Sequence, residues 1–153
     1  MPFYEQRALE GASAIDLVVA LYDGIIRFLH SAAQAVDRRD ATARRIAVKR
    51  ALDIVIHLQA RLRLDVGGKP AQVLSEFYAS IFAEILRASQ SASRPKFEHA
   101  INCVHGVRDA WKQVAIDLNL AEQAATSHSL SGSPSPIQVV GEMDVSSLTD
   151  WTA

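Results

Sequence analysis

The residues best suited to metal chemistry in this sequence are His99 and Cys103, whose i, i+4 spacing would place them one turn apart on the same face of a helix. A structural zinc site needs four ligands, and no second ligand pair of suitable spacing is visible. The di-iron sites of helical bundles need inward Glu residues and Glu-x-x-His pairs, and the sequence contains no Glu-x-x-His. We therefore predict no metal and no cofactor, and interpret the pair as a semi-exposed histidine and a small buried cysteine.

Other catalytic or phosphate-binding patterns are also missing from the sequence. There is no Gly-rich phosphate loop, nucleophile elbow or convergent acid-base set, which argues against an enzyme. One basic cluster could contact phosphates, but acidic neighbours dilute it, and a solvated helix face is the simpler interpretation: Arg44, Arg45, Lys49 and Arg50. The net charge is −1, so we predict no nucleic-acid partner.

The segment that organises the rest of the chain is residues 14–36, where two apolar stripes occur at helical spacing. The first stripe suits the core of a bundle: Leu17, Ala20, Leu21, Ile25, Phe28, Leu29, Ala32 and Val36. The second stripe lies beside it: Val18, Val19, Tyr22 and Ile26. A helix that is apolar on two faces is either buried all round or keeps one face for a partner. Ser13 and Asp16 resemble a capping box at the start of this helix, and Gly24 inside it suggests close approach of another backbone.

Three further helices are predicted at residues 42–64, 71–91 and 95–124. Thr42 is a candidate cap for the first, Gly67 and Gly68 should end it, and Pro70 and Pro95 suit the first turns of the next two. The fourth repeats apolar residues at helical spacing, including Trp111, which we assign to the core together with Phe28. Short connections make neighbouring helices antiparallel, so the predicted fold is all-α, an antiparallel up-and-down four-helix bundle.

The two ends of the chain differ from this body. Residues 1–12 lack a periodic pattern but contain Phe3, Tyr4 and Leu9, which indicates a short N-terminal arm able to lie on the bundle. We divide the 153 residues into a bundle domain, 1–125, and a flexible tail, 126–153, made of a Ser/Pro linker and an acidic, apolar end that could dock weakly on the bundle. The lone Cys103 and the absence of a secretory or membrane-spanning run predict a cytoplasmic protein.

Five features together resemble the flagellar secretion chaperone family FliS, over about residues 3–118. They are Tyr4, the run ALYDGIIRFLHSAAQAV at 20–36, the helix RALDIVIHLQARLRLDVGG at 50–68, the aromatic FYASIFAEILRAS at 77–89 and VRDAWKQ at 107–113. Their order and spacing make the resemblance fairly specific. It implies a non-enzymatic chaperone that binds the disordered C-terminal segment of flagellin in apolar grooves and prevents premature polymerisation before export.

The surplus apolar residues of the first three helices are the predicted client-binding site. They are Val18, Val19, Tyr22, Ile26, Val48, Leu52, Val55, Ile56, Tyr78, Phe82 and Ile85. We expect the hydroxyl of Tyr22 to stay hydrated at this surface. The expected partners are the flagellin segment and the flagellar export gate, with a mostly monomeric free protein. The alternatives are that both stripes are simply core, or that the extra stripe mediates homo-oligomerisation, as a homodimer for example, in a structural or adaptor protein without a client.

Overall fold

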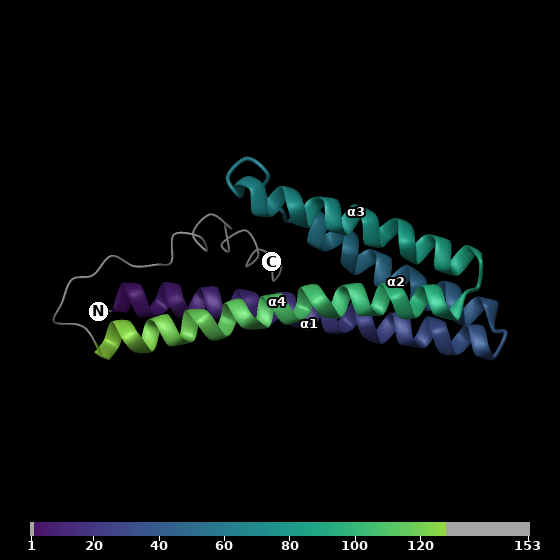
Figure 1. Cartoon of the computed structure of the whole chain (residues 1–153), viewed down its shortest axis with the longest axis horizontal. Coiled ribbons are helices and arrows are strands. Elements are labelled where there is room, and N and C mark those ends of the chain that lie inside the picture. The colour runs from purple at the N-terminus through teal and green to yellow at the C-terminus, as the bar shows by residue number, and fades with distance from the viewer. Residues whose placement is uncertain (1, 128–153) are drawn as a thin grey trace.

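Four antiparallel helices make up the part of the chain that the computed structural model describes, residues 2–127, with side chains from residue 14 onward. They are α1 (Pro2–Asp37), α2 (Ala41–Ala60), α3 (Gly68–Gln90) and α4 (Arg94–Ser127). Helices α1 and α3 each pack against α2 and α4, and the chain runs alternately up and down (Figure 1). The predicted up-and-down four-helix bundle is confirmed. None of these helices is long and apolar enough to span a membrane.

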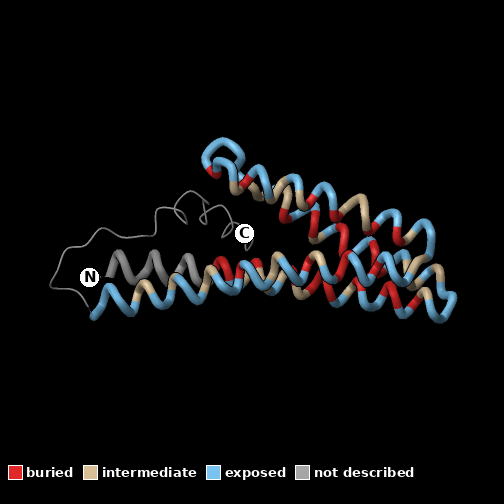
Figure 2. Tube along the Cα trace, viewed as in Figure 1, coloured by how far each residue is buried: buried red, intermediate tan, exposed pale blue. Residues whose placement is uncertain are grey.

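The helices are unequal in length, which places the core toward one end. Helices α1 and α4 have 36 and 34 residues, against 20 and 23 in α2 and α3. At 1.5 Å per residue the long pair extends roughly 20 Å beyond the α2–α3 hairpin. Figure 2 shows that buried residues concentrate where all four helices lie together, whereas the C-terminal part of α4 is largely exposed.

Two tight turns close the end at which the four helices overlap. Arg39 (φ 56°) and Ala92 (φ 45°) both adopt the left-handed conformation after a helix end. In each turn the next residue donates its backbone N–H to a carbonyl five residues back, Asp40 to the Ala35 carbonyl and Ser93 to the Ala88 carbonyl. This is the Schellman arrangement, which satisfies helix-end carbonyls within a three-residue connection.

Several helix ends differ from the sequence prediction. Helix α1 continues back to Pro2, so Ser13 lies inside a helix rather than at its start. Asp40 rather than Thr42 caps α2, accepting a hydrogen bond from the Ala43 N–H at 3.0 Å. The second helix ends at Ala60, well before the glycines that were expected to stop it.

The connection between α2 and α3 spans residues 61–67 and ends in a glycine that is needed for a different reason. A Cβ on Gly67 would lie 2.6 Å from the Arg63 carbonyl oxygen and 2.5 Å from the Ala71 Cβ, too close for any other residue without a shift. Pro70 and Pro95 do lie in the first turns of α3 and α4, as predicted. The side chains of Phe3, Tyr4 and Leu9, and residues 128–153, lie outside the described part, so the docking of arm and tail stays a prediction.

Both apolar stripes of α1 contribute to the core, because α2 covers one side of this helix and α4 the other. The buried members come from each stripe: Ile25, Leu29 and Ala32 from the first, and Val18, Tyr22 and Ile26 from the second. Gly24 is buried against a side chain rather than a backbone, since a Cβ there would meet Ile54 Cδ1 at 3.1 Å. The alternative in which both stripes are core therefore describes most residues of the two stripes.

Candidate functional site

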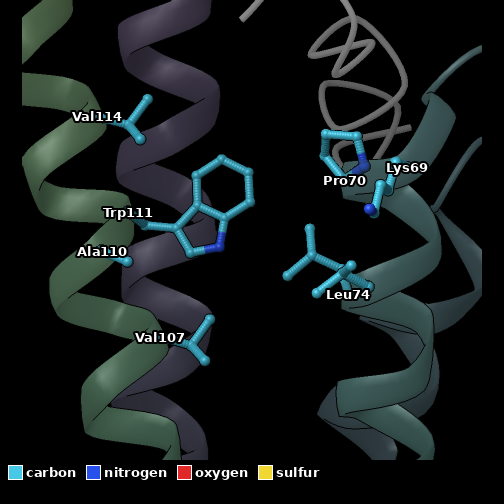
Figure 3. Close-up of a pocket in the computed structure, with 8 residues that line it drawn as sticks. Lys69, Pro70, Leu74, Val107, Ala110, Trp111 and Val114 are labelled. Carbon is cyan, nitrogen blue, oxygen red and sulfur yellow. The ribbon is translucent and has the colours of Figure 1, made fainter. Parts of the chain in front are cut away.

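An apolar pocket lies between the N-terminal part of α3 and the middle of α4 (Figure 3). Its volume is about 420 Å³, within the range of about 300–1,000 Å³ typical of ligand-binding pockets. Its lining is almost entirely hydrocarbon: Lys69, Pro70, Val73 and Leu74 from α3, and Val107, Ala110, Trp111 and Val114 from α4. None of these eight residues supplies a carboxylate, hydroxyl, thiol or imidazole, and Lys69 is the one polar side chain among them, so the pocket is suited to holding apolar groups.

Helical spacing explains how each helix forms its wall. Val107, Trp111 and Val114 follow one another at four and three residues, so they share one face of α4. On α3 the opposing residues fall in the first two turns, directly after the connection at residues 61–67. Val73 is 53% exposed although it lines the pocket, which means that the pocket opens to solvent along α3.

Trp111 joins the pocket to the core through a three-residue hydrogen-bond network. The indole N–H of Trp111, on α4, donates to the hydroxyl of Tyr22, on α1, at 3.0 Å. That hydroxyl shares a second hydrogen bond of 2.5 Å with the hydroxyl of Tyr78, on α3. All three residues are buried, and their polar atoms are paired with one another. The network therefore satisfies the polar edge of the indole inside the bundle while the ring lines the pocket.

An ion pair one turn from this network fixes the register of α4 against α1. The Arg108 guanidinium makes two hydrogen bonds with the Asp23 carboxylate, one of them from Nη2 to Oδ2 at 3.4 Å. The Arg108 side chain is only 19% exposed, so water screens this pair less than an ordinary surface pair. The hydrogen bond to Asp23 also raises the pKa of Arg108. Because Asp23 follows Tyr22, the pair holds Trp111 opposite its tyrosine partner.

The two tyrosine hydroxyls of the Trp111 network stay neutral at physiological pH. Burial raises the pKa of Tyr22 to about 12, although the hydrogen bonds from Tyr78 and Trp111 act in the opposite direction. Burial, and then the charge that Tyr22 would carry, raise the pKa of Tyr78 well above its ordinary value. The hydroxyls linked to Trp111 therefore carry no charge that would oppose an apolar occupant of the pocket.

The residues that the sequence predicted for client binding are mostly inside the bundle. Eight are buried: Val18, Tyr22, Ile26, Val48, Leu52, Val55, Tyr78 and Ile85. Val19 and Phe82 are half-buried, and Ile56 is 51% exposed. The expectation of a hydrated Tyr22 hydroxyl is wrong, because Tyr22 is fully buried and its hydroxyl bonds to Tyr78 and Trp111. Contact between this set and a client stays a prediction.

The two residues that the sequence assigned to the core, Trp111 and Phe28, differ in how far they are buried. Trp111 is buried as predicted, with 6% of its surface exposed. Phe28 is half-buried at the edge of the core, where the guanidinium carbons of Arg27 and Arg50 lie 5.7 and 5.8 Å from its ring centroid. These distances allow cation–π attraction, so the Phe28 ring contacts guanidinium groups as well as the apolar core.

None of the pocket-lining residues was among the predicted client-binding residues. The pattern of Val107, Trp111 and Val114 was visible as an apolar face, but periodicity cannot tell which helix such a face meets or whether the meeting is complete. Within residues 14–127, Glu84, His99 and Cys103 form a group outside the pocket that could together hold a metal ion. Glu84 lies toward the C-terminal end of α3, whereas the pocket lies at its N-terminal end.

Comparisons with known proteins agree on one family. A family model described as "Flagellar protein FliS" matches residues 2–118, close to the predicted 3–118. A relative named flagellar secretion chaperone FliS, from Campylobacter jejuni, is 31% identical over 111 residues, which are 72% of this chain and 87% of the relative. Proteins of the same name from Salmonella typhimurium and Bacillus subtilis are 28% and 24% identical, each over 72% of this chain and over 82% and 81% of their own lengths.

Proposed function

The chain belongs to the FliS family of flagellar secretion chaperones, and from this premise we propose that it is a cytoplasmic export chaperone for flagellin. In this proposal it binds the disordered C-terminal segment of flagellin and prevents premature polymerisation before secretion. The relatives are named as chaperones, which is a non-enzymatic role, and the proposed activity needs no chemical step.

The observation that carries the proposal is the open apolar pocket between α3 and α4. A disordered client segment that folds as an amphipathic helix must bury its apolar side chains in a groove to offset the entropy lost on ordering. A pocket of about 420 Å³ lined by hydrocarbon offers that burial without leaving a polar group unpaired. Lys69 at its edge can cover an apolar client with its aliphatic stem while its ammonium group stays hydrated.

We also propose that the client contact extends beyond the pocket to the solvent-accessible members of the predicted set, Ile56, Val19 and Phe82. A segment long enough to be held as an export client would cover more than one such position. The buried members of the set would support this surface from below, and their direct contact with a client would require the helices to separate. The flagellar export gate is a second proposed partner.

Three large apolar residues of nearly equal exposure allow a matched test. Val73 lines the pocket, Ile56 belongs to the predicted client set and Ile46 belongs to neither, and their exposed fractions are 53%, 51% and 52%. Each would be changed to Asp, because a carboxylate in an apolar contact is costly to desolvate. Binding of the host flagellin C-terminal segment is then measured by isothermal titration calorimetry.

The proposal expects Val73→Asp to weaken flagellin binding at least tenfold and Ile56→Asp to weaken it measurably, while Ile46→Asp leaves it unchanged. Thermal melts should stay similar in all three variants, because each position is half exposed. Equal losses in all three variants would remove the pocket from the proposal. Absence of binding by the unchanged protein would overturn the proposed function itself.

The competing hypothesis is a helical protein that only self-associates. A groove reserved for a client should leave the free protein mostly monomeric, whereas a self-association surface should raise the mass with concentration. Light scattering over a hundredfold range of protein concentration distinguishes the two. A dimer that persists through dilution and excludes the flagellin segment would favour the structural alternative.

A further inference from the structure

A cluster of three different metal-binding groups lies on the α3–α4 hairpin, away from the apolar pocket. His99 and Cys103 are one turn apart on α4, and Glu84 faces them from α3. Glu84 was not visible as a partner in the sequence, because it lies 15 residues before His99 and on another helix. The fold therefore supplies a third ligand beside the His99–Cys103 pair.

Two of the three separations between the ligand atoms are already close to those around a coordinated ion. His99 Nε2 lies 3.7 Å from Cys103 Sγ and 3.7 Å from Glu84 Oε1, and all three ligand atoms lie within 4.8 Å of one another. Tetrahedral zinc at its usual bond lengths separates nitrogen and oxygen ligands by about 3.3 Å, and sulfur from either by about 3.6 Å. The two contacts of His99 thus need only a few tenths of an ångström of adjustment, whereas the separation of Cys103 from Glu84 must shorten by up to about 1.2 Å.

We propose that Glu84, His99 and Cys103 bind one divalent transition-metal ion of the Zn²⁺ type. The ion is held by a carboxylate oxygen, an imidazole nitrogen and a thiolate sulfur, and the fourth position is filled by water. Thiolate and imidazole ligands select against Mg²⁺ and Ca²⁺, which prefer oxygen ligands. The His99 side chain is 67% exposed, so the ion can enter from solvent.

The chemistry of the three groups fits a cation. A divalent ion between them attracts both the thiolate of Cys103 and the carboxylate of Glu84. Without the ion, His99 can only bridge the two groups through a weak contact to sulfur and a pairing with Glu84.

The position of the cluster determines what the ion does to the fold. Glu84 lies ten residues beyond Leu74, about 15 Å along α3 from the pocket. The ion therefore fastens α3 to α4 near the tight turn at residues 91–93 and leaves the pocket end of the hairpin unrestrained. This effect is separate from client binding and does not depend on the proposed function.

The test is titration of the full chain, stripped of metal by a chelator, with Zn²⁺ alone. We expect one Zn²⁺ per chain, a rise in melting temperature with Zn²⁺ concentration, and at least tenfold weaker binding in each of Glu84→Gln, His99→Gln and Cys103→Ser. Substituting Co²⁺ should produce a thiolate-to-metal absorption band that Cys103→Ser abolishes.

The control variants are His105→Gln, an exposed histidine on α4, and Glu76→Gln, an exposed carboxylate on α3. Both should bind Zn²⁺ like the unchanged chain. Wild-type affinity in Glu84→Gln would reduce the site to a two-ligand surface pair and overturn the proposal, as would loss of binding in His105→Gln. Circular dichroism melts without metal check that each variant folds, and a Zn²⁺-dependent melting shift retained in Cys103→Ser would also refute it.

Discussion

Removing one hydroxyl from the centre of the bundle should reveal how strongly the Tyr22 network holds three helices together. In Tyr22→Phe the ring stays, but the atom that accepts from Trp111 and pairs with Tyr78 is lost. Both partners are buried, so the substitution leaves two polar groups unsatisfied. The comparison variant is Tyr78→Phe, in which Tyr22 keeps its hydrogen bond from Trp111.

The expected losses of stability follow from the number of buried polar groups that each variant leaves without a hydrogen-bond partner. A buried donor or acceptor without a partner costs about 1–3 kcal/mol, so Tyr22→Phe should lower the free energy of unfolding by about 2–6 kcal/mol. Tyr78→Phe removes one hydrogen bond and should cost about 0.5–1.5 kcal/mol. The double variant no longer contains the stranded Tyr78 hydroxyl, so it should cost less than the two single variants added together.

Urea unfolding followed by helical circular dichroism at pH 7 measures all four proteins on one scale. The reasoning requires Tyr22→Phe to be the more harmful single variant. If Tyr78→Phe costs as much, or if the double-variant cycle is additive, the Tyr22 hydroxyl is not the shared partner. Binding of the flagellin segment should be affected only through stability, in contrast to the sequence-based view of Tyr22 as a surface residue.

One change of pH, two substitutions and one truncation have defined expected outcomes. Folding raises the pKa of Tyr22 from 10.0 to about 12, so the stability contributed by its neutral form is fully present below pH 10. About 3 kcal/mol of this stability should be lost as the pH rises toward 12. Denaturant unfolding at pH 8 and pH 11.5 should therefore show a smaller loss of stability in Tyr22→Phe than in the unchanged protein. Asp40→Ala removes the cap on the Ala43 N–H and should lower stability by about 0.5–2 kcal/mol in thermal melts, and an unchanged melt would contradict the cap. Ala92→Gly should raise the free energy of unfolding by up to about 1 kcal/mol, because φ 45° strains alanine but not glycine; a lower melting temperature would refute this. Truncation after Ala125 should tighten and speed flagellin binding if residues 137–151 compete for the groove, and unchanged rates in stopped-flow mixing would exclude that role.

The four helices could be predicted from the sequence because their apolar residues recur at helical spacing, and Trp111 could be placed in the core for the same reason. The partition of α1 into a core stripe and a client stripe could not. Val18 and Tyr22 lie on a face that would be free in a helix with one neighbour, but α1 has two packed neighbours, and only the tertiary arrangement says so. Helical periodicity indicates that a face is apolar, but it does not indicate which element covers that face.

The site was harder to predict than the fold, because it depends on pairs of helices. Val73 and Trp111 are 38 residues apart, and nothing in their separate patterns shows that α3 and α4 leave a pocket between them. Glu84 was overlooked as a ligand for a similar reason. Local signals also misled: the glycines at 67 and 68 suggested a helix end, whereas α2 had already ended at Ala60.

Trp111, in the wall of the pocket, is also a fluorophore. The chain has two tryptophans, and in a Trp151→Phe background the emission spectrum would come from Trp111 alone. Its ring faces the pocket while its N–H is held by Tyr22, so an apolar segment entering the pocket changes the surroundings of the ring without displacing its hydrogen bond. Occupancy of the pocket can therefore be followed in real time as a change in intrinsic fluorescence, with no label on either chain, and the protein carries its own reporter of the event that is proposed to define its function.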